Sequence, residues 1–589
     1  MTLTDTTLDA AALIVMDTKM SGLITASSLT SVTGTSADIA AFAAVETTGT
    51  AIASITNYAA TASGTTTVTE ANAIDAANGT GAITATLSDS ATNLATLTQT
   101  GGTNAYTVTV TGASATAAQL NTINGITSIA VGASGITTIS SSLIADIATF
   151  VAAETAGTIT AATNYAVVAS DATTVAQANA IDAANGSGVI TAGITSTAAD
   201  LATLTGTGNT YTTTVSAGTV AATDLNTIDA ATTVAVIATA VTGITGTAAD
   251  IKTAVTSVGI TQPTSHTVNV NSGTISVTDA NIIDALGSTG IITATITTGT
   301  AATLAGLTGT GNAYTTTVSA GAVTAANLNA IDAATTVAVD ATLVTDISGS
   351  NADFATLITT NTATTNLAAN YTATISGTPS AAEVNVVLAD TSNVVTATGV
   401  VADTAANLDS ALANGNAADA LTLTLDAATQ AAASIIAIDA KTSVDIVASA
   451  ATGITGTGAD VAAVLLAVTN STISALSGSE TLTATAATAA EATSIFAATT
   501  SGVTNVALAA LSANTTATML IAAGDKLDLH TLDSSLVDTA VASSTTPGQH
   551  NWDITGGHLY VGVDATHTLD ITLTGSTTAT STTGVLTFA

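Results

Sequence analysis

The 589-residue chain contains no cysteine and no arginine, only 3 prolines, and 2% aromatic residues. Without cysteine, disulfides and cysteine-ligated zinc sites cannot form. Only 4 basic residues, all lysine, stand against 40 acidic residues, and the net charge is −36. The chain therefore offers no basic surface for phosphates or anionic lipid headgroups, and we expect neither a nucleic-acid partner nor attachment to a membrane surface.

Long hydrophobic runs are also missing. Thr, Ser, Asn or Asp recurs every few positions, so no stretch of about twenty apolar residues predicts a transmembrane helix or membrane insertion. Residues 1–20 lack a basic segment followed by an apolar one, and we expect no cleavable secretory signal there. Hydrophobic residues nevertheless make up 47% of the chain, and the mean hydropathy is +0.56. These values favour a folded protein over a disordered one.

Internal repeats are the strongest positive signal. The segment AIDAANG at 73–79 returns at 180–186, and more loosely as IIDA at 282–285, a spacing of about one hundred residues. A related landmark, LNTIN at 120–124, returns as LNTID at 225–229 and LNAID at 328–332. A third, GTAADI at 246–251, recurs in variant form near residues 35, 197, 350 and 457. The elementary module is thus about 25 residues long.

Each module combines two periodicities. Residues 106–111 alternate larger apolar residues with Thr, and residues 266–271 do so less cleanly, which predicts half-buried strands. In 222–231, Leu225 and Ile228 have helical spacing. The Thr247-x-x-Asp250 pattern has the spacing of a helix capping box, and Asp200 belongs to the same set. A strand followed by a short helix is therefore expected in each module.

This size and order predict an α/β repeat solenoid, in which each module buries its apolar face by stacking on its neighbours. The alternatives are an all-β solenoid or a string of α+β modules, because Thr-rich segments have weak helix propensity. The expected parts are a divergent N-terminal repeat or cap at 1–54, four repeat units, a divergent partial repeat at 472–520, and a C-terminal β-rich module at 521–589. The four repeat units are 55–158, 159–259, 260–363 and 364–471.

The C-terminal module differs in composition, with four of the five His and the only Trp. Its segment GDKLDLHTLD at 524–533 resembles the turn and strand near the C-termini of type I secreted bacterial proteins, and GGHLYV at 556–561 and LDITLTG at 569–575 resemble their last hairpins. The apolar end VLTFA at 585–589 also fits. The resemblance implies export through an uncleaved C-terminal signal. The G-G-x-G-x-D nonapeptides that bind calcium in RTX proteins are absent.

The repeat region resembles the Ala/Thr/Asp-rich arrays of surface-layer and giant surface proteins of marine bacteria, including cyanobacteria. The phrases DLNTID at 224–229 and GTAADI at 246–251 carry this resemblance. It implies a structural or adhesive role at the cell surface, outside the cell.

A regular series of aspartates is the main candidate site. Its members are Asp75, Asp182, Asp229, Asp284, Asp332 and Asp439. One interpretation is structural, with each carboxylate accepting backbone N–H bonds in a turn. The other is calcium binding, since Ca²⁺ takes six to eight oxygen ligands from Asp, Asn, Thr and backbone carbonyls. For this second interpretation the predicted ligands are Asp229, Asp332, Asp182 and Asp75.

No pattern indicates catalysis. His530, His550, His558 and His567 have irregular spacing, which favours hairpin residues over a zinc site. No nucleophile elbow, P-loop or dinucleotide-binding motif stands out, so we expect no enzyme.

Three functions remain. We expect a secreted structural protein that self-assembles into a surface layer, sheath or filament, with other copies of itself and the cell envelope as partners. The alternative is a secreted adhesin or biofilm-matrix protein with the repeats as a spacer. Ice binding is a weaker third hypothesis, because it needs one flat Thr face and Thr is spread over strands and expected turns.

Overall fold

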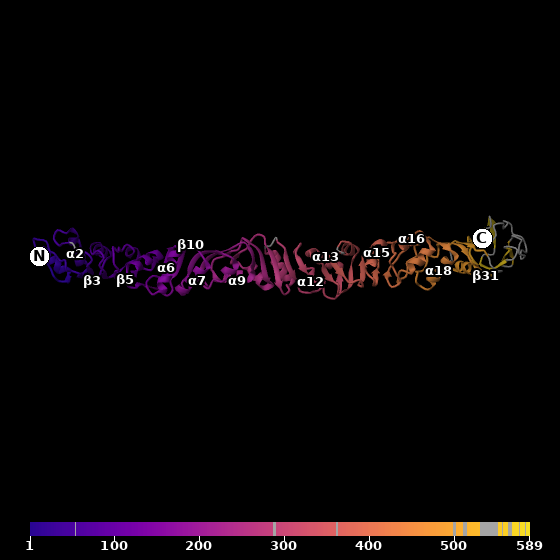
Figure 1. Cartoon of the computed structure of the whole chain (residues 1–589). Coiled ribbons are helices and arrows are strands. Elements are labelled where there is room, and N and C mark those ends of the chain that lie inside the picture. The colour runs from indigo at the N-terminus through magenta and orange to yellow at the C-terminus, as the bar shows by residue number, and fades with distance from the viewer. Residues whose placement is uncertain are drawn as a thin grey trace. The chain divides into compact units, whose positions relative to one another are not determined.

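The computed structural model describes residues 1–53, 55–286, 290–360, 363–498, 502–510, 515–529, 552–555, 558–562, 568–575, 578–582 and 585–588. They form an α/β fold of many short strands and helices (Figure 1). The chain divides into two compact units, Met1–Thr295 and Ile296–Ala589. The division falls inside the repeat unit expected at 260–363.

The helices are short and recur throughout both units. In Met1–Thr295 they are α1 (Ala10–Lys19), α2 (Ser36–Thr48), α3 (Val68–Ala77), α4 (Ala91–Leu94), α5 (Ala117–Ile126), α6 (Ile144–Thr155), α7 (Val175–Asn185), α8 (Ala198–Leu201), α9 (Ala222–Ala231), α10 (Ala248–Thr256) and α11 (Val277–Ala285). In Ile296–Ala589 they are α12 (Ala301–Leu304), α13 (Ala325–Ala334), α14 (Asn351–Ala355), the π-helix η1 (Thr356–Thr360), α15 (Ala381–Asp390), α16 (Ala405–Ala411), α17 (Ala432–Asp439), α18 (Gly458–Thr469) and α19 (Ala489–Ala498).

The strands of Met1–Thr295 pair in parallel with strands of the modules before and after them. One sheet has the order β1 (Thr7–Asp9), β2 (Ser31–Thr35), β3 (Ala59–Thr65), β4 (Ile83–Ser90), β5 (Ala105–Thr111), β7 (Val131–Ala133), β9 (Ile159–Ala161). A second has the order β6 (Ser114–Thr116), β8 (Thr138–Ser142), β10 (Ala166–Thr173), β11 (Ile190–Ser196), β12 (Thr210–Val215), β14 (Val236–Ile237), β16 (Ile260–Thr261). A third contains β13 (Gly218–Ala221), β15 (Val241–Thr247), β17 (Thr267–Ser272) and β18 (Ile292–Thr295).

In Ile296–Ala589, β19 (Ala313–Thr315) comes first. One sheet has the order β20 (Gly321–Thr324), β22 (Val344–Ser350), β24 (Thr372–Ser376), β25 (Val395–Ala397), β26 (Ala420–Leu421), and β21 (Val339–Ala341) pairs with β23 (Thr365–Leu367). Another has the order β27 (Thr429–Ala431), β28 (Gly453–Thr457), β29 (Thr481–Ala487), β30 (Thr504–Leu508), β32 (Lys526–Asp528), β37 (Val585–Phe588), β36 (Ala579–Thr582). The last has the order β31 (Thr515–Ile521), β35 (Thr568–Gly575), β34 (His558–Gly562), β33 (Trp552–Thr555).

Most helices begin directly after a Thr or Ser whose hydroxyl group caps the first turn, at the positions that the repeat pattern predicts. Thr247 precedes α10, and its Oγ1 accepts a 3.2 Å hydrogen bond from the Asp250 backbone N–H. Thr197 does the same for Asp200 at the start of α8. Such a cap contributes about 1 kcal/mol to helix stability. The expected helix starts are therefore confirmed. The two carboxylates accept hydroxyl groups, Asp250 from Thr247 and Asp200 from Ser196, instead of the backbone N–H of a capping box.

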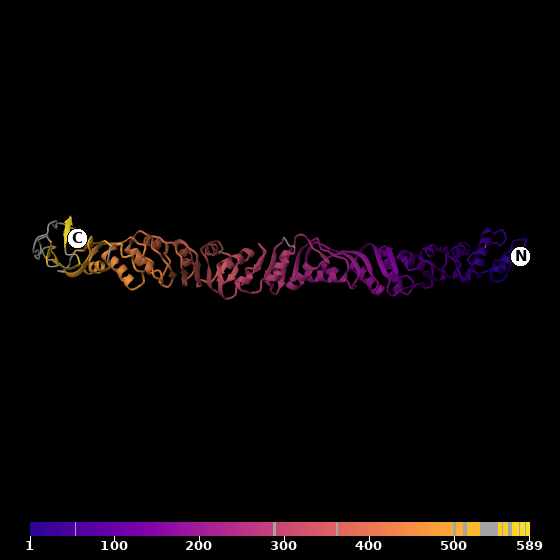
Figure 2. The ribbon, with the colours of Figure 1, turned by 180° about the vertical axis from the view of Figure 1, so that it is seen from behind.

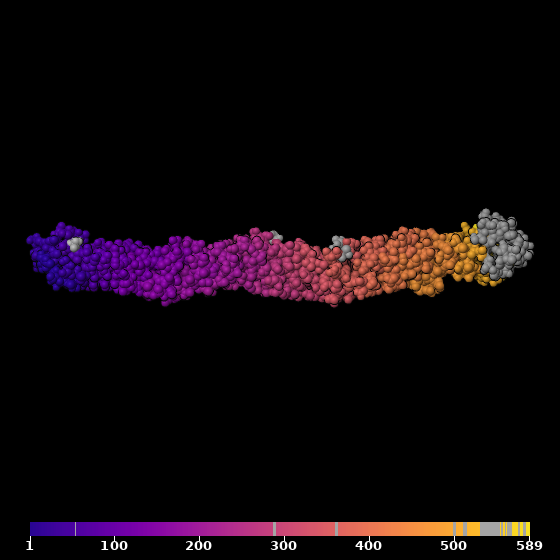
Figure 3. Space-filling model, viewed as in Figure 1, coloured from indigo at the N-terminus to yellow at the C-terminus, as the bar shows by residue number. Residues whose placement is uncertain are grey.

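Strand alternation sets the core. In β5, Tyr106, Val108 and Val110 are buried, while Thr107 and Thr109 between them are exposed. Successive strand residues point to opposite faces of a sheet, and one face of each strand is apolar. The strands contact helices of their own and of the preceding module, as β10 contacts α7 and α6. Consecutive helices also contact one another, as α9 contacts α10 and α10 contacts α11. Within each unit the chain colour therefore changes gradually from one module to the next in both views (Figure 1, Figure 2) and on the surface (Figure 3).

The α/β class and the alternation of strand and helix are confirmed, with mostly parallel sheets. The helix expected at 222–231 is α9, with the same bounds. The strand expected at 266–271 is β17, which begins one residue later, and His266 directly before it is buried, at 4% exposed. Among the described residues, antiparallel pairs occur only between strands that follow Gly524, where β32, β33, β34, β35, β36 and β37 take part.

Candidate functional site

The predicted calcium ligands all lie in the last turns of helices. Asp75 is in α3, Asp182 in α7, Asp229 in α9 and Asp332 in α13, and Asp439 closes α17 in the same way. The structure does not bring them together into one cluster, since each belongs to a different module. Four of these carboxylates instead contact the loop that follows the next helix, and Asp332 contacts Thr365, the first residue of β23.

Asp75 is the most enclosed of the series, at 1% exposed. Its Oδ2 accepts hydrogen bonds from Thr98 Oγ1 at 2.8 Å, from the Thr100 backbone N–H at 2.9 Å and from Thr100 Oγ1 at 2.9 Å. A buried carboxylate needs such donors to offset its lost hydration. For Asp75 the structural interpretation, a turn held by backbone N–H, agrees with the geometry.

The other aspartates of the series accept mainly hydroxyl groups. Asp182 accepts Thr205 Oγ1 at 3.0 Å, Asp229 accepts Ser257 Oγ at 2.7 Å, and Asp332 accepts Thr365 Oγ1 at 3.3 Å. Thr472 Oγ1 lies 3.1 Å from Asp439, and burial raises the pKa of that carboxyl. The bonds run between modules instead of within one turn, so the series joins successive modules.

Glycine allows this approach. A Cβ at Gly206 would lie 2.2 Å from Asp182 Oδ1, and a Cβ at Gly259 would lie 2.0 Å from Asp229 Oδ1. Both distances are far below van der Waals contact, so only glycine fits beside these two carboxylates. No group of three His, Asp or Glu side chains within the described residues could hold a metal ion. Calcium binding by these aspartates stays a prediction.

An asparagine series on the helices was not recognised in the sequence. Asn72 Nδ2 donates to Thr96 O at 2.9 Å, Asn121 Nδ2 to Asp146 O at 2.8 Å, and Asn226 Nδ2 to Asp250 O at 3.1 Å. Asn121 and Asn226 thus bind the backbone of the next helix, and Asn72 binds the backbone just after α4. The N in the repeated ANAI and LNTI phrases was the available signal, but its partner is a carbonyl group about 25 residues away.

Buried tyrosines form a second series that the sequence did not reveal. Tyr58, Tyr106, Tyr165, Tyr211, Tyr314 and Tyr371 are all fully buried. Tyr165 Oη donates to Glu154 Oε2 at 2.6 Å, and Tyr371 Oη donates to Asp390 Oδ2 at 2.6 Å. Burial raises the pKa of each of these two phenols, and the neighbouring carboxylate raises it further.

Phenylalanine completes two of these pairs. Phe42 meets Tyr58 edge-on with ring centroids 5.7 Å apart, and Phe150 meets Tyr165 at 5.5 Å. Glu46 lies beside Tyr58, with its Oε1 accepting the Ile55 backbone N–H at 2.6 Å. Burial raises the pKa of Glu46 and of Glu154, while the hydrogen bonds that they accept oppose this. The aromatic rings and Glu46 lie inside the core, whereas Glu154 is only partly buried.

The histidines expected in C-terminal hairpins are described only in part. His558 lies in β34, and its Nδ1 is 3.0 Å from Asp570 Oδ1 of the neighbouring strand β35. His530, His550 and His567 lie outside the described residues. The described part of the module therefore contains one histidine–carboxylate pair across two strands.

One groove is mainly apolar. It has a volume of about 590 Å³, runs between α18 and α19, and is lined by Ala462, Leu465, Leu466 and further residues of the two helices. Glu491, its one charged residue, accepts the Thr488 backbone N–H at 2.8 Å and so begins α19. The groove therefore presents apolar side chains and one carboxylate, which is already engaged at the start of α19.

The outward faces of the parallel sheets carry rows of small hydroxyl side chains. In the first sheet, Thr33, Thr61 and Thr84 occupy neighbouring positions on β2, β3 and β4, and Thr86 is beside Thr107 of β5. In the second sheet, Thr191 is beside Thr210 and Thr195 is beside Thr214. Adjacent strands lie about 4.8 Å apart, so these side chains form regular, flat rows.

Charge is separated from these rows. Among the described strands of Met1–Thr295 the charged residues are Asp9, Asp89 and Asp171. Each accepts a backbone N–H at a helix start, from Ala12, Ser90 and Ile144 respectively. Apart from Asp5, the other acidic residues of this unit lie in helices. The sheet faces are therefore nearly neutral and the helical faces are acidic.

Within the described residues no helix has the length and apolarity needed to cross a membrane. Comparisons of the chain with models of protein families, with curated proteins and with solved structures find no match.

Proposed function

We propose that the protein is a secreted, non-enzymatic structural protein of the cell surface, whose modules form an α/β solenoid. It associates with further copies of itself through the neutral faces of its parallel sheets. The observation that carries this proposal is the separation of charge in Met1–Thr295, with rows of Thr on the sheets and acidic residues on the helices.

Electrostatics makes the sheet face the favourable contact. Two chains of charge −36 repel each other, and at physiological salt this repulsion extends over about 8 Å. Contact through the sheet faces keeps the acidic helices of the two copies on opposite sides of the assembly. Thr side chains in a strand are already restricted in rotation, so ordering them in a contact costs little entropy.

Calcium is the proposed cofactor of assembly, with a weak affinity typical of extracellular sites. Asp75 is the poorest candidate of the four predicted ligands, because Thr98 and Thr100 already surround it. Asp229 and Asp332 are better candidates. A complete oxygen shell would need hydroxyl and carbonyl groups of neighbouring loops, or acidic groups of a second copy.

Electron microscopy of the purified full chain tests the proposal. With millimolar calcium we expect ordered sheets or filaments, which dissolve on addition of a chelator. The double variant T107E/T212E places two charges on exposed strand positions and is expected to abolish assembly. The matched control T149E/T227E places the same charges on exposed positions of α6 and α9, and is expected to assemble like the original chain.

The adhesin is the alternative function. Single particles at all calcium concentrations would contradict self-assembly and favour an adhesin with a repeat spacer. Equal loss of assembly in both double variants would contradict the sheet face as the contact. Assembly that is indifferent to chelator would remove calcium from the proposal and leave the contact itself in place.

A further inference from the structure

One position is shared by four repeat units and is occupied by two kinds of residue. Tyr58, Tyr165, His266 and Tyr371 each directly precede a strand, namely β3, β10, β17 and β24. All four side chains are buried. His266 therefore stands where the other repeat units have tyrosine.

Glycine contacts confirm that the backbone is the same at three of these positions. A Cβ at Gly81 would lie 1.8 Å from the Tyr58 carbonyl oxygen, and one at Gly188 would lie 1.9 Å from that of Tyr165. At Gly290 the distance to the His266 carbonyl oxygen would be 2.2 Å. Each glycine belongs to the module that follows. The following module therefore packs against the same backbone carbonyl group in all three cases.

The surroundings of the side chain differ. The last turns of α2 and α6 provide Glu46 to Tyr58 and Glu154 to Tyr165. α10 ends earlier, at Thr256, and Val258 occupies the position of these glutamates and is fully exposed. Ala254 stands where α6 has Phe150. Its carbonyl oxygen accepts Gln262 Nε2 at 2.8 Å.

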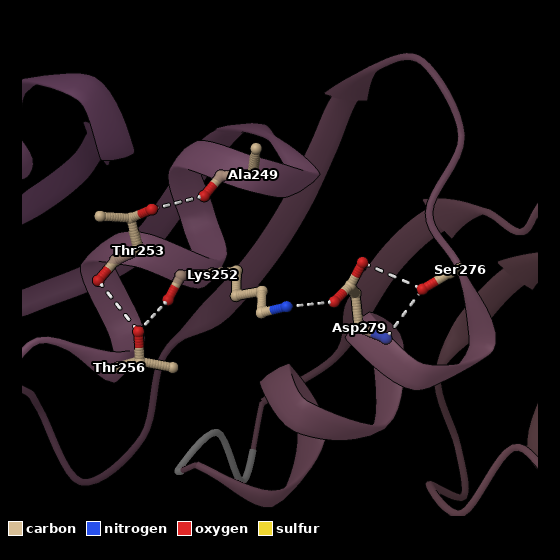
Figure 4. Close-up of polar contacts among 6 residues, drawn as sticks. All are labelled: Ala249, Lys252, Thr253, Thr256, Ser276 and Asp279. Carbon is tan, nitrogen blue, oxygen red and sulfur yellow. Dashed lines mark hydrogen bonds and ion pairs between the residues drawn. The ribbon is translucent and has the colours of Figure 1, made fainter.

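The charged groups on the elements around His266 have partners of their own. On α10, Lys252 Nζ lies 2.7 Å from Asp279 Oδ1 of α11 (Figure 4), and Asp250 accepts Thr247 Oγ1. Asp229 of α9 accepts Ser257 Oγ. Asp284 is at the end of α11, at the position of Asp75 and Asp182. His266 itself has a hydrogen bond with the Pro263 backbone.

We propose that residues 260–285, the His266 module (β16, β17 and α11), are an acid-sensitive element that opens locally when His266 is protonated. The corresponding Tyr165 module, residues 159–185 (β9, β10 and α7), stays closed under the same conditions. A charged imidazolium that is buried loses its hydration, whereas the opened module exposes it to water.

The direction follows from linkage. Burial lowers the pKa of His266 below its usual 6.5, and the bond to Pro263 opposes this. The stabilising effect of a neutral, buried His266 is complete above pH 6.5 and is lost as the pH falls toward its folded pKa. Glu154 behaves in the opposite way, because burial raises its pKa. Protonated Glu154 stabilises the folded Tyr165 module. This stabilisation is complete below the usual pKa of a carboxyl group and is lost as the pH rises through the pKa of Glu154 in the folded state.

Hydrogen exchange followed by mass spectrometry tests the proposal on the full chain. Protection factors, corrected for intrinsic rates, are compared for peptides of the two modules between pH 7.5 and pH 5. We expect protection of the His266 module to fall by up to about 30-fold at pH 5, given an opened-state pKa of about 6.5. Protection of the Tyr165 module is expected to hold or rise.

Two variants assign the effect to the imidazole. H266Y restores the residue of the other repeat units, and H266Q keeps a small polar side chain that does not titrate. Either variant is expected to abolish the acid-induced fall in protection. A fall of the same size in H266Q, or equal behaviour of the two modules in the original chain, would overturn the proposal. The test is independent of self-assembly, since it is read on dispersed protein.

Discussion

The Tyr165 module and the His266 module have the same order of elements and differ in the chemistry of one buried position. In the first, a phenol, a carboxyl group and a phenyl ring fill the space between helix and strand. In the second, a buried imidazole occupies the same position and bonds to the Pro263 backbone, and the preceding helix is shorter. The two modules therefore share their parallel strand pairing and their glycine contacts. They differ in the buried polar side chain, and that side chain determines how the stability of each module responds to pH.

The largest expected effect concerns Gly188 and Gly290, which pack against the backbone of the Tyr165 module and of the His266 module. G188A and G290A each place a Cβ against a backbone carbonyl oxygen, and we expect a local loss of about 3 kcal/mol or more in each. The matched control is G193A, because no heavy atom lies within 4 Å of a Cβ there. Local free energies from hydrogen exchange are the measurement. Tolerance of G290A alone would show that the two backbones are not equivalent.

Placing a histidine in the Tyr165 module tests whether acid sensitivity can be transferred to it. The double variant Y165H/E154Q removes the carboxylate and places an imidazole in the Tyr165 module. We expect this module to become acid-sensitive, with protection reduced up to about 30-fold at pH 5.

The control for this transfer is Y165H alone. There, Glu154 remains as a partner for the imidazolium, so a much smaller effect of acid is expected. If both variants respond equally to pH, the neighbouring carboxylate does not decide the behaviour.

A smaller effect is expected from E154Q alone. The substitution removes a carboxylate that burial disfavours, while an amide oxygen still accepts the Tyr165 hydroxyl. We expect a small gain in stability at pH 7 and no further gain on acidification. Local stability of the Tyr165 module between pH 7.5 and pH 4 is the measurement. A variant that still becomes more stable in acid would point to another group.

The smallest effect concerns how the two preceding helices begin. α10 begins with Thr247, whose hydroxyl accepts the Asp250 N–H, whereas α6 follows Leu143 and takes its acceptor from Asp171 of strand β10. We expect T247A and D171A to cost about 1 kcal/mol each. T227A, on the exposed face of α9, is the control for general loss of a hydroxyl. A neutral D171A would mean that a side chain from the next module cannot replace a local cap.

Much of the local structure could be predicted from the sequence. Thr followed three residues later by Asp marks helix starts such as Thr247 and Thr197, because a hydroxyl beside unpaired N–H groups acts over a few residues only. The alternation in 106–111 likewise predicts β5 and its exposed Thr residues. The candidate aspartates were found by their regular recurrence, but their hydroxyl partners were not.

Partners that lie one module away could not be predicted. Asn121 was visible in LNTIN, yet its acceptor is the Asp146 carbonyl group of the next helix. Tyr165 and Glu154 are separated by a helix end and a loop, and only the fold places the hydroxyl 2.6 Å from the carboxylate. His266 was interpreted as the first residue of a half-buried strand, and its burial fits the alternation with Val268 and Val270. The groups on α10 and α11 that surround it could not be read from that alternation.

The sequence by itself determined the module length, the alternation of strand and short helix, the helix starts and the acidic composition, because these follow from periodicity and from contacts within one turn of the chain. Only the tertiary structure decided which faces are neutral and which carboxylates are enclosed. It also showed that His266 occupies the position of a buried tyrosine in the other repeat units. Those properties arise when modules about 25 residues apart pack on one another, and a buried group is stabilised or destabilised by neighbours that no local pattern specifies.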